Sequence, residues 1–407
     1  MKISIFPILS LATLVFTACS DDNPTLGSDL ISADEQVKLE SISTDTLSGF
    51  RFSVSYEDYN PVTANASYLT IGETNNPRAG NLTTQAAIRL IQGSQNGFVP
   101  DSLVSVLEAK LFLTPSAINL GDTTRPFTLR IQELQNLPVF SSMKLKDQLS
   151  AGPVVADTTF AGILRSRFSV TVSNRSWVEN MLKLFGNTSD TLLLNQYSKG
   201  LLLSSPASNG RSIGLFGFAS NLSFFGYLDD PEVRVRTVIR TGNQQTDTVT
   251  VTFTLGSANQ LSSFTPGPVF SDPNSLGIYA LSGKRAKLTF DTSVIPTKST
   301  VFSGKLVFSD ITTDTTQYRS SILVSLTSIN PTDQSATSPL NSTRLASNRK
   351  LSFNIATIMQ YWSLRGAGPG LYLIPGSEAS ATDYMEFSLD PAVTSSRPVL
   401  SLVFSRR

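Results

Sequence analysis

Apolar and polar residues alternate along many short segments of this 407-residue chain. The alternation is clear in EVRVRTV (232–238), TVTVTFTL (248–255) and LSLVF (400–404). A period of two is typical of a strand with one buried face. Turn-forming clusters of Gly, Pro, Asn and Asp separate such segments, as in ETNNPRAGN (73–81) and TPGPVFSDPN (265–274). The pattern predicts an all-β fold of antiparallel β-sandwich (jelly-roll) domains.

Two segments show a helical period instead. Their apolar positions are Trp177, Met181, Leu184 and Phe185 in the first segment, and Ile355, Ile358, Met359 and Trp362 in the second. This spacing puts each set on one face of a helix. Gly186 can end the first helix in the left-handed conformation. In the second, Asn354 can cap the start and Gly366 can end the helix. We therefore expect one short helix in each half of the chain.

Six segments of the first half resemble six segments of the second half, in the same order. The matched ranges are 44–54 and 246–256, 88–92 and 287–291, 99–113 and 295–308, 168–177 and 353–362, 200–203 and 370–373, and 230–238 and 397–404. The offset between matched segments falls steadily, as expected for two copies of one domain when the second has shorter loops. The sequence predicts a tandem duplication, with jelly-roll domains at 44–240 and 241–407.

The first 18 residues predict a signal peptide. Lys2 is basic, residues 3–15 are almost wholly apolar, and Thr17-Ala18 precedes Cys19, the only cysteine of the chain. This arrangement resembles the bacterial lipoprotein signal, in which a peptidase cuts before the cysteine and the sulfur is lipidated. Phe16 departs from the Leu or Val usual three residues before that cut. We predict lipidation of Cys19; the alternative is an ordinary secretory signal with Cys19 discarded or free.

The residues after Cys19 add a second signal. Ser20, Asp21 and Asp22 resemble the acidic export signal by which Bacteroidota-type lipoproteins reach the outer face of the outer membrane. The alternative is a solvated linker. We predict an acidic flexible tether over 19–43, and a protein that is held in the outer membrane by its lipid and faces the cell exterior. After cleavage no segment of about 18 apolar residues remains to span a membrane.

Composition excludes several classes of function. Charged residues make up 15 % of the chain, against about 25 % on average, and the net charge is +1. No basic cluster predicts binding to nucleic acid or to an anionic membrane surface. The chain has no histidine, which excludes His-based acid–base catalysis, Ser-His-Asp triads and imidazole metal sites. With Cys19 lipidated, thiol chemistry is excluded too. We predict no metal and no cofactor.

A glycosidase would need only two carboxylates. The candidates are Glu57, Asp58, Asp229, Asp230, Glu232, Glu386 and Asp390. None of them lies in a recognisable catalytic motif, and a turn before the last strand explains Asp229-Asp230. We therefore predict that the protein is not an enzyme.

The order of the repeated motifs resembles the DNRLRE-type, carbohydrate-binding-module-like jelly-roll domain. The motifs are an apolar–Pro start followed by Lys-Leu, then Phe-x-(Val/Ile) with a later Trp, then Gly-Leu-x-Leu, and a Pro-led last strand. That family usually has Asp before the helix, where this chain has Ser169 and Asn354. The segment 26–46 also resembles an uncharacterised family of Bacteroidota lipoproteins. These resemblances imply a surface lipoprotein with jelly-roll domains.

Sugar-binding modules stack aromatic side chains on sugar rings. Trp177 and Trp362 occupy matched positions on apolar helix faces, so we expect them in the core. Aromatic residues outside the periodic pattern are better candidates for contact with a ligand. They are Tyr56, Tyr59, Phe225, Tyr227, Tyr318 and Tyr384. The aromatic, Gly-rich segment 217–230 is the favoured binding loop, and its alternative role is packing against the second copy.

Asp-(Ser/Thr)-apolar triplets are similar to the O-glycan acceptor pattern of exported Bacteroidota proteins. Thr46 and Thr248 lie in two such triplets that match across the repeat, and we predict glycosylation there.

Two functions fit the sequence. The first is a non-catalytic surface lipoprotein that binds a glycan or another envelope component. The alternative is a structural or assembly subunit that contacts another outer-membrane protein.

Overall fold

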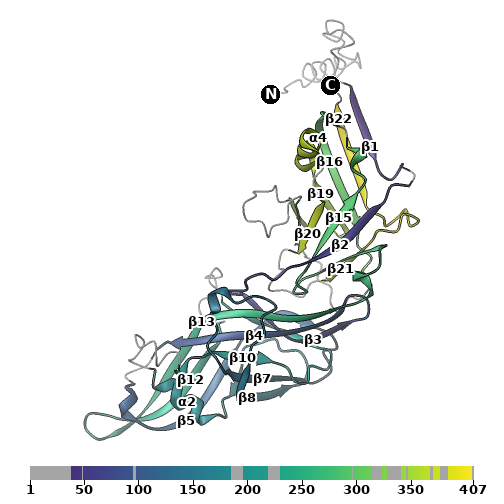
Figure 1. Cartoon of the computed structure of the whole chain (residues 1–407). Coiled ribbons are helices and arrows are strands. Elements are labelled where there is room, and N and C mark those ends of the chain that lie inside the picture. Colours follow the sequence, from purple (N-terminus) through teal and green to yellow (C-terminus); the bar gives the residue numbers. More distant parts are fainter. Residues whose placement is uncertain are drawn as a thin grey trace, which may run out of the picture.

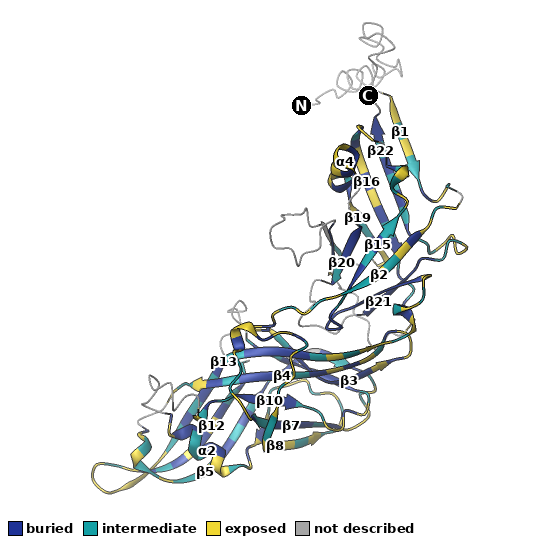
Figure 2. Cartoon of the chain, in the orientation of Figure 1, coloured by how far each residue is buried: buried dark blue, intermediate teal, exposed yellow. Residues whose placement is uncertain are grey.

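The computed structural model describes residues 38–47, 49–94, 98–184, 196–218, 230–295, 297–313, 323–327, 341–344, 347–366, 370–375 and 384–405. These residues form antiparallel sheets around two large hydrophobic cores, which confirms the predicted all-β sandwich fold. Figure 1 shows two sandwiches that follow one another along an elongated molecule. Figure 2 shows buried residues on the inner faces of both. The signal peptide, Cys19 and the export signal lie outside the described residues.

The first sandwich, domain 1, spans residues 62–266. It contains β3 (Tyr68–Asn76), β4 (Gly80–Gln92), β5 (Leu103–Leu113), β6 (Pro115–Leu120), β7 (Phe127–Leu134), β8 (Ala151–Phe160), β9 (Phe168–Thr171), α2 (Arg175–Leu182), β10 (Leu201–Ser204), β11 (Ser212–Phe216), β12 (Glu232–Arg240) and β13 (Thr246–Pro266). The long strand β13 pairs first with β12 and then with β4, so it belongs to both layers. Its register shifts around Gly256, where a Cβ atom would lie 2.6 Å from Ile91.

The second sandwich, domain 2, combines residues 39–58 with residues 275–405. It contains β1 (Leu39–Ser43), β2 (Phe52–Asp58), β14 (Ser275–Tyr279), β15 (Lys284–Phe290), β16 (Thr300–Ser309), β17 (Leu323–Thr327), β18 (Asn341–Arg344), β19 (Lys350–Asn354), α4 (Ala356–Arg365), β20 (Leu371–Pro375), β21 (Tyr384–Ser388) and β22 (Val399–Ser405). The 3₁₀ turns are η2 (Pro100–Ser102) and η3 (Phe140–Ser142) in domain 1, η4 (Pro268–Phe270) between the domains, and η5 (Thr292–Val294) in domain 2.

The two sandwiches have the same strand order. One layer is β9-β5-β12-β13 in domain 1 and β19-β16-β22-β1 in domain 2. The other is β8-β7-β10-β4-β13 in domain 1 and β18-β17-β20-β15-β2 in domain 2. The register agrees as well, because Leu111 pairs with Val233 as Leu306 pairs with Leu400. The repeated motifs of the sequence therefore fall on equivalent strands.

One repeat match is wrong by two residues. Leu111 pairs with Val170, whereas the equivalent Leu306 pairs with Phe353. The ungapped match was anchored on a shared Phe and Trp, but domain 1 has two extra residues before its helix. Ser169 accordingly lies in β9, and the cap of α2 is Asn174, whose Oδ1 accepts the Trp177 N–H.

The end of α4 is as predicted, and its start differs by one residue. Gly366 ends the helix at φ +93°, and its N–H donates to the Trp362 carbonyl. The N-cap position is occupied by Ile355, while Asn354 accepts the Ala356 N–H through Oδ1. Gly186 lies outside the described residues.

The path of the chain crosses the predicted domain boundary. The matched segments 44–54 and 246–256 exchange places, because β2 pairs with β15 in domain 2 and β13 pairs with β4 and β12 in domain 1. Domain 1 is thus inserted between β2 and β14, and the change of sandwich does not fall at 240/241. The last residues of the predicted tether, 39–43, form β1 and pair with β22. Strand alternation shows which face is buried and leaves the pairing partner open.

We expect Phe52→Ala to destabilise domain 2, although Phe52 belongs by sequence to the first copy. Phe52 is 6 % exposed and packs edge-on against Phe290 at 5.5 Å. Loss of a buried Phe costs about 3–5 kcal/mol. Hydrogen exchange should accelerate in β15 and β22, and the control Ser53→Ala, at an exposed position, should change little. Faster exchange confined to domain 1 would contradict this assignment.

Candidate functional site

Two of the tyrosines predicted to contact a ligand have their hydroxyls bound to groups inside the protein. Tyr384 is 1 % exposed, and its hydroxyl donates to Glu386 at 3.0 Å. The Tyr56 hydroxyl accepts the Gly277 N–H at 2.8 Å, and its ring lies against Phe270. Those two predictions are wrong, because each hydroxyl satisfies a polar group inside the fold and thereby draws its ring inward.

Tyr59 is covered by a cation. The Arg285 guanidinium lies over the ring, 3.2 Å from its centroid, in the place where a sugar would stack. Tyr59 is half-buried, so contact of this residue with a ligand stays a prediction. Phe225, Tyr227 and Tyr318 lie outside the described residues, and so does most of the favoured loop 217–230. Trp177 and Trp362 are buried in the cores of domains 1 and 2, as expected.

The two domains meet in a small apolar cluster that contains side chains of both. Ala79, Leu82 and Leu145 come from domain 1 and pack with Tyr279, Leu281 and Tyr384 of domain 2 and with Val269 of η4. Polar contacts border this cluster. The Thr74 and Tyr279 hydroxyls are 2.8 Å apart, and Ser262 donates to the Leu281 carbonyl at 2.6 Å. Rigid strands on both sides thus fix the junction between the domains.

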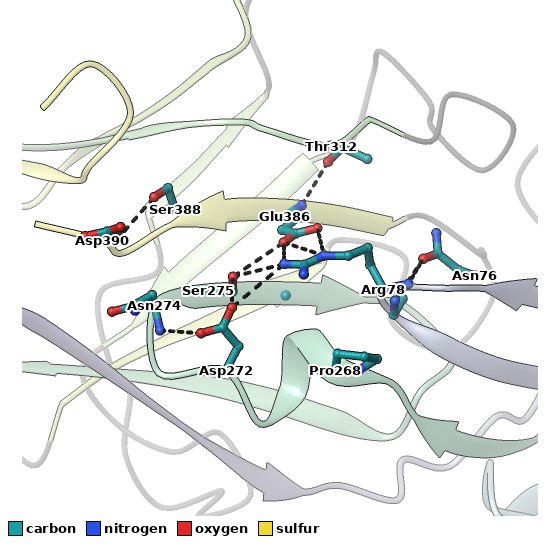
Figure 3. Close-up of polar contacts among 12 residues, drawn as sticks. Asn76, Arg78, Pro268, Asp272, Asn274, Ser275, Thr312, Glu386, Ser388 and Asp390 are labelled. Atoms are coloured by element: carbon teal, nitrogen blue, oxygen red, sulfur yellow. Dashed lines mark hydrogen bonds and ion pairs between the residues drawn. The ribbon is translucent and has the colours of Figure 1, made fainter. Parts of the chain in front are cut away.

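An ion pair crosses the junction, as Figure 3 shows. Arg78, in the turn between β3 and β4, binds the carboxylate of Glu386 on β21 through Nη2 and through Nε, which is 3.2 Å from Oε1. Glu386 is 4 % exposed, and Ser275 lies 3.2 Å from Arg78 Nη2. Asn76 Oδ1 shapes the turn by accepting the Arg78 N–H at 2.8 Å. The Glu386 carboxylate thus links the turn between β3 and β4 of domain 1 to β21 of domain 2.

Three other carboxylates that the sequence analysis named as glycosidase candidates also have hydrogen-bond or ion-pair partners. Glu57 accepts from Lys287 at 3.3 Å and from Tyr372 at 3.1 Å. Glu232 pairs with Arg167 at 2.6 Å, and Asp390 accepts the Ala392 N–H at 2.9 Å. Within the described residues, no group of three or more His, Cys, Asp and Glu side chains could hold a metal ion.

The two domains also line an open polar groove of about 550 Å³, here called the junction groove. Its floor is the β4–β13 ladder, where Thr83 faces Ser263 and Gln85 faces Leu261. One wall is the segment 146–149 of domain 1. Domain 2 contributes Asp58, Ser282 and Lys284, and Asp58 contacts Lys146 at 3.0 Å. The remaining lining residues are Ser262, Phe264 and Pro266.

The charges of the junction groove are balanced and fixed in place. Asp58 accepts from Lys146 and Lys284, each at 3.0 Å, and the Lys146 hydrogen bond, followed by that of Lys284, lowers the pKa of Asp58. The Lys146 N–H donates to Asn60 Oδ1 at 2.8 Å. With Asp147 as the second acid, two cations face two anions. A groove of hydroxyls, amides and neutralised charges suits a polar ligand of low net charge.

The junction groove was missed at the level of sequence because its residues come from five distant segments. Asp58, Thr83, Lys146, Ser263 and Lys284 each lie on a different one. Only the chain path across the domains brings them together, and no local motif marks them.

Both predicted glycosylation residues are exposed. Thr46 follows β1 and donates to the Ser43 carbonyl at 2.8 Å, whereas Thr248 lies within β13. They are not equivalent in the fold, since Ile42 and Val251 occupy the same register position opposite β22 and β12. Glycosylation of either residue stays a prediction.

Comparison with known proteins finds no family model that matches the chain. No curated protein shows significant similarity to it. In the described part of the chain, no helix is long and apolar enough to cross a membrane.

We expect Arg78→Ala to destabilise the junction, because it leaves the Glu386 carboxylate buried without its cation. The loss should be roughly 1–3 kcal/mol, measured by chemical denaturation. Arg78→Ala combined with Glu386→Gln should recover part of it, since the buried charge is then removed. Arg175→Ala, which breaks an exposed pair within α2, is the control and should cost under about 0.5 kcal/mol. Equal losses for Arg78 and Arg175 would contradict the role of the pair.

Burial raises the pKa of Tyr56 to about 12. The unfolded chain loses this proton near pH 10 while the folded chain retains it. Stability is therefore full below pH 10 and declines by up to about 3 kcal/mol as the pH approaches 12. Tyr56→Phe should show a shallower decline in denaturation measured across this range, together with lower stability at pH 8 because Gly277 loses its acceptor. Identical slopes for the two proteins would refute the assignment.

Proposed function

We propose that this protein is a non-catalytic lipoprotein of the outer membrane that faces the cell exterior and binds a glycan in its junction groove. The groove itself is the observation that carries the proposal. Ligand sites of about 300–1,000 Å³ occur preferentially between domains, and the volume of about 550 Å³ falls in this range. The floor consists of paired strands, which hold their side chains in fixed positions without a ligand.

The lining matches the chemistry of a sugar. Thr83, Ser263 and Gln85 offer hydroxyl and amide groups that both donate and accept hydrogen bonds. Phe264 adds an apolar surface, and its ring is held by edge contacts with Phe270 at 5.2 Å and with Tyr279 at 5.6 Å. A sugar ring combines hydroxyl edges with apolar C–H faces, so a neutral saccharide complements this surface.

The anchor is a separate part of the proposal. It rests on the signal sequence that ends at Cys19 and on the acidic residues that follow. The structure of the described residues is compatible with it, because β1 begins at Leu39, well beyond Cys19. Domain 2 would then be the domain joined directly to the tether.

A second candidate function is an assembly subunit that contacts another outer-membrane protein. It is favoured by two large apolar side chains at equivalent irregular positions of β5 and β16. Leu107 is 51 % exposed and Phe302 is 55 % exposed, and the strand register shifts at both. Bulges redirect side chains and are common beside functional surfaces.

Glycan-array screening of the folded protein tests the first candidate. We expect binding to a neutral polysaccharide and loss of at least about tenfold in affinity with Ser263→Tyr, because a ring there fills the groove. Ser53→Tyr, on an exposed strand position that does not line the groove, is the matched control. Binding that is unaffected by Ser263→Tyr, or no binding to any glycan, would refute the proposed site. Crosslinking to a membrane protein that requires Leu107 and Phe302 would instead support the assembly role.

A further inference from the structure

Residues 39–58, here called the donor segment, complete a domain from which they are separated by more than two hundred residues of sequence. We propose that domain 2 is a strand acceptor that can take the donor segment of a second copy of this chain. The product is a dimer in which residues 275–405 of each copy assemble with the donor segment of the other copy. This exchange does not depend on glycan binding.

The donor segment contributes to both layers of domain 2. All five residues of β1 pair with β22, and all seven residues of β2 pair with β15. The turn between the two strands is also held, because Thr44 Oγ1 accepts the Leu400 N–H at 2.9 Å. Phe52 lies in the hydrophobic core, and Tyr56 reaches Gly277 on a third strand. The acceptor site is therefore specific in register, in core packing and in polar contacts.

The donor segment is joined to domain 1 by a very short connection. Tyr59 still donates its N–H to the Gly283 carbonyl of domain 2 at 2.9 Å. Val62 already pairs with Lys144 of domain 1. Only Asn60 and Pro61 stand between these two points of attachment. Because so few residues separate these attachments, the donor segment and domain 1 of one copy enter the exchange together.

Exchange between folding units already exists inside the single chain. The start of each sequence copy, 44–54 and 246–256, forms strands in the sandwich of the other copy. In domain 1, β13 pairs with β12 and with β4. In domain 2, the equivalent pairs are β1 with β22 and β2 with β15. A second copy carries the same donor segment, so the exchanged dimer reproduces each strand pairing of the monomer. The equilibrium between monomer and exchanged dimer then depends on protein concentration and on the connection 267–274 between the domains.

Of the two connections between the domains, only one has a different path in the exchanged dimer. Because Asn60-Pro61 is short, domain 1 of the donating copy stays beside the domain 2 that accepts its strands. Arg78 of one copy then pairs with Glu386 of the other. The connection 267–274, which contains η4, is the hinge that must reach between the two halves of the dimer. Short hinge connections of this kind favour exchange between copies.

A disulfide test uses two adjacent serines. Ser43 Oγ and Ser401 Oγ lie 3.3 Å apart across the β1–β22 pair, so cysteines at both positions meet the distance needed for a bond. Two full-length chains are prepared in a Cys19→Ser background, one with Ser43→Cys and the other with Ser401→Cys. They are mixed unfolded, refolded over a range of concentrations and oxidised. We expect a mixed disulfide dimer whose ratio to monomer rises about tenfold for each tenfold rise in monomer concentration.

Two controls make the outcome decisive. The chain with both cysteines should form an internal disulfide when it is refolded at high dilution. The two single variants mixed after folding, at low concentration, should give no mixed dimer. Phe52→Asp on the Ser43→Cys chain should abolish the mixed dimer, because a carboxylate would enter the core of the acceptor. Internal disulfide without mixed dimer at any concentration, with monomer alone in light scattering, would overturn the proposal.

Discussion

The pairing of the donor segment with β22 and β15 is the constraint on which the rest of the structure depends. It sends the chain into domain 2 first, then through the whole of domain 1, and back again. Two connections therefore join the domains, and the turn that carries Arg78 is brought against β21. The ion pair with Glu386, the apolar cluster at the junction and the junction groove all follow from this path. None of them exists within one sandwich alone.

The junction contains both a buried ion pair and an open polar groove. The buried carboxylate of Glu386 has its cation, and the Tyr384 hydroxyl adds a further donor. This arrangement satisfies the requirement that a buried charge be both paired and hydrogen-bonded. In the groove nearby, Asp58 is exposed and balanced by two lysines. Rigid walls with little net charge are what binding by hydrogen bonds requires, because such a site keeps its shape before a ligand arrives.

The fold class was predictable because strand alternation and core volume are local properties of the sequence. The positions of Trp177 and Trp362 could be inferred for the same reason. The exchange of β2 and β13 could not be, since alternation determines which face is buried and is silent about the neighbouring strand. The tyrosines misled for a related reason. Tyr56 and Tyr384 are strand residues rather than loop residues. Tyr56 continues the alternation of Phe52 and Val54 on the core side of β2, and Tyr384 begins β21, in which all five residues are buried.

The separation in sequence between β1 and β22 has a consequence for how the protein matures. During synthesis the donor segment emerges before the whole of domain 1, while β22 appears only after it. Domain 1 is contiguous and can fold as soon as β13 is complete, but the donor segment must stay extended until then and beyond. Closing so long a loop is slow, and an unpaired strand is prone to aggregate in the meantime. The donor segment is therefore the part of the chain that is exposed longest to misassembly before domain 2 is complete.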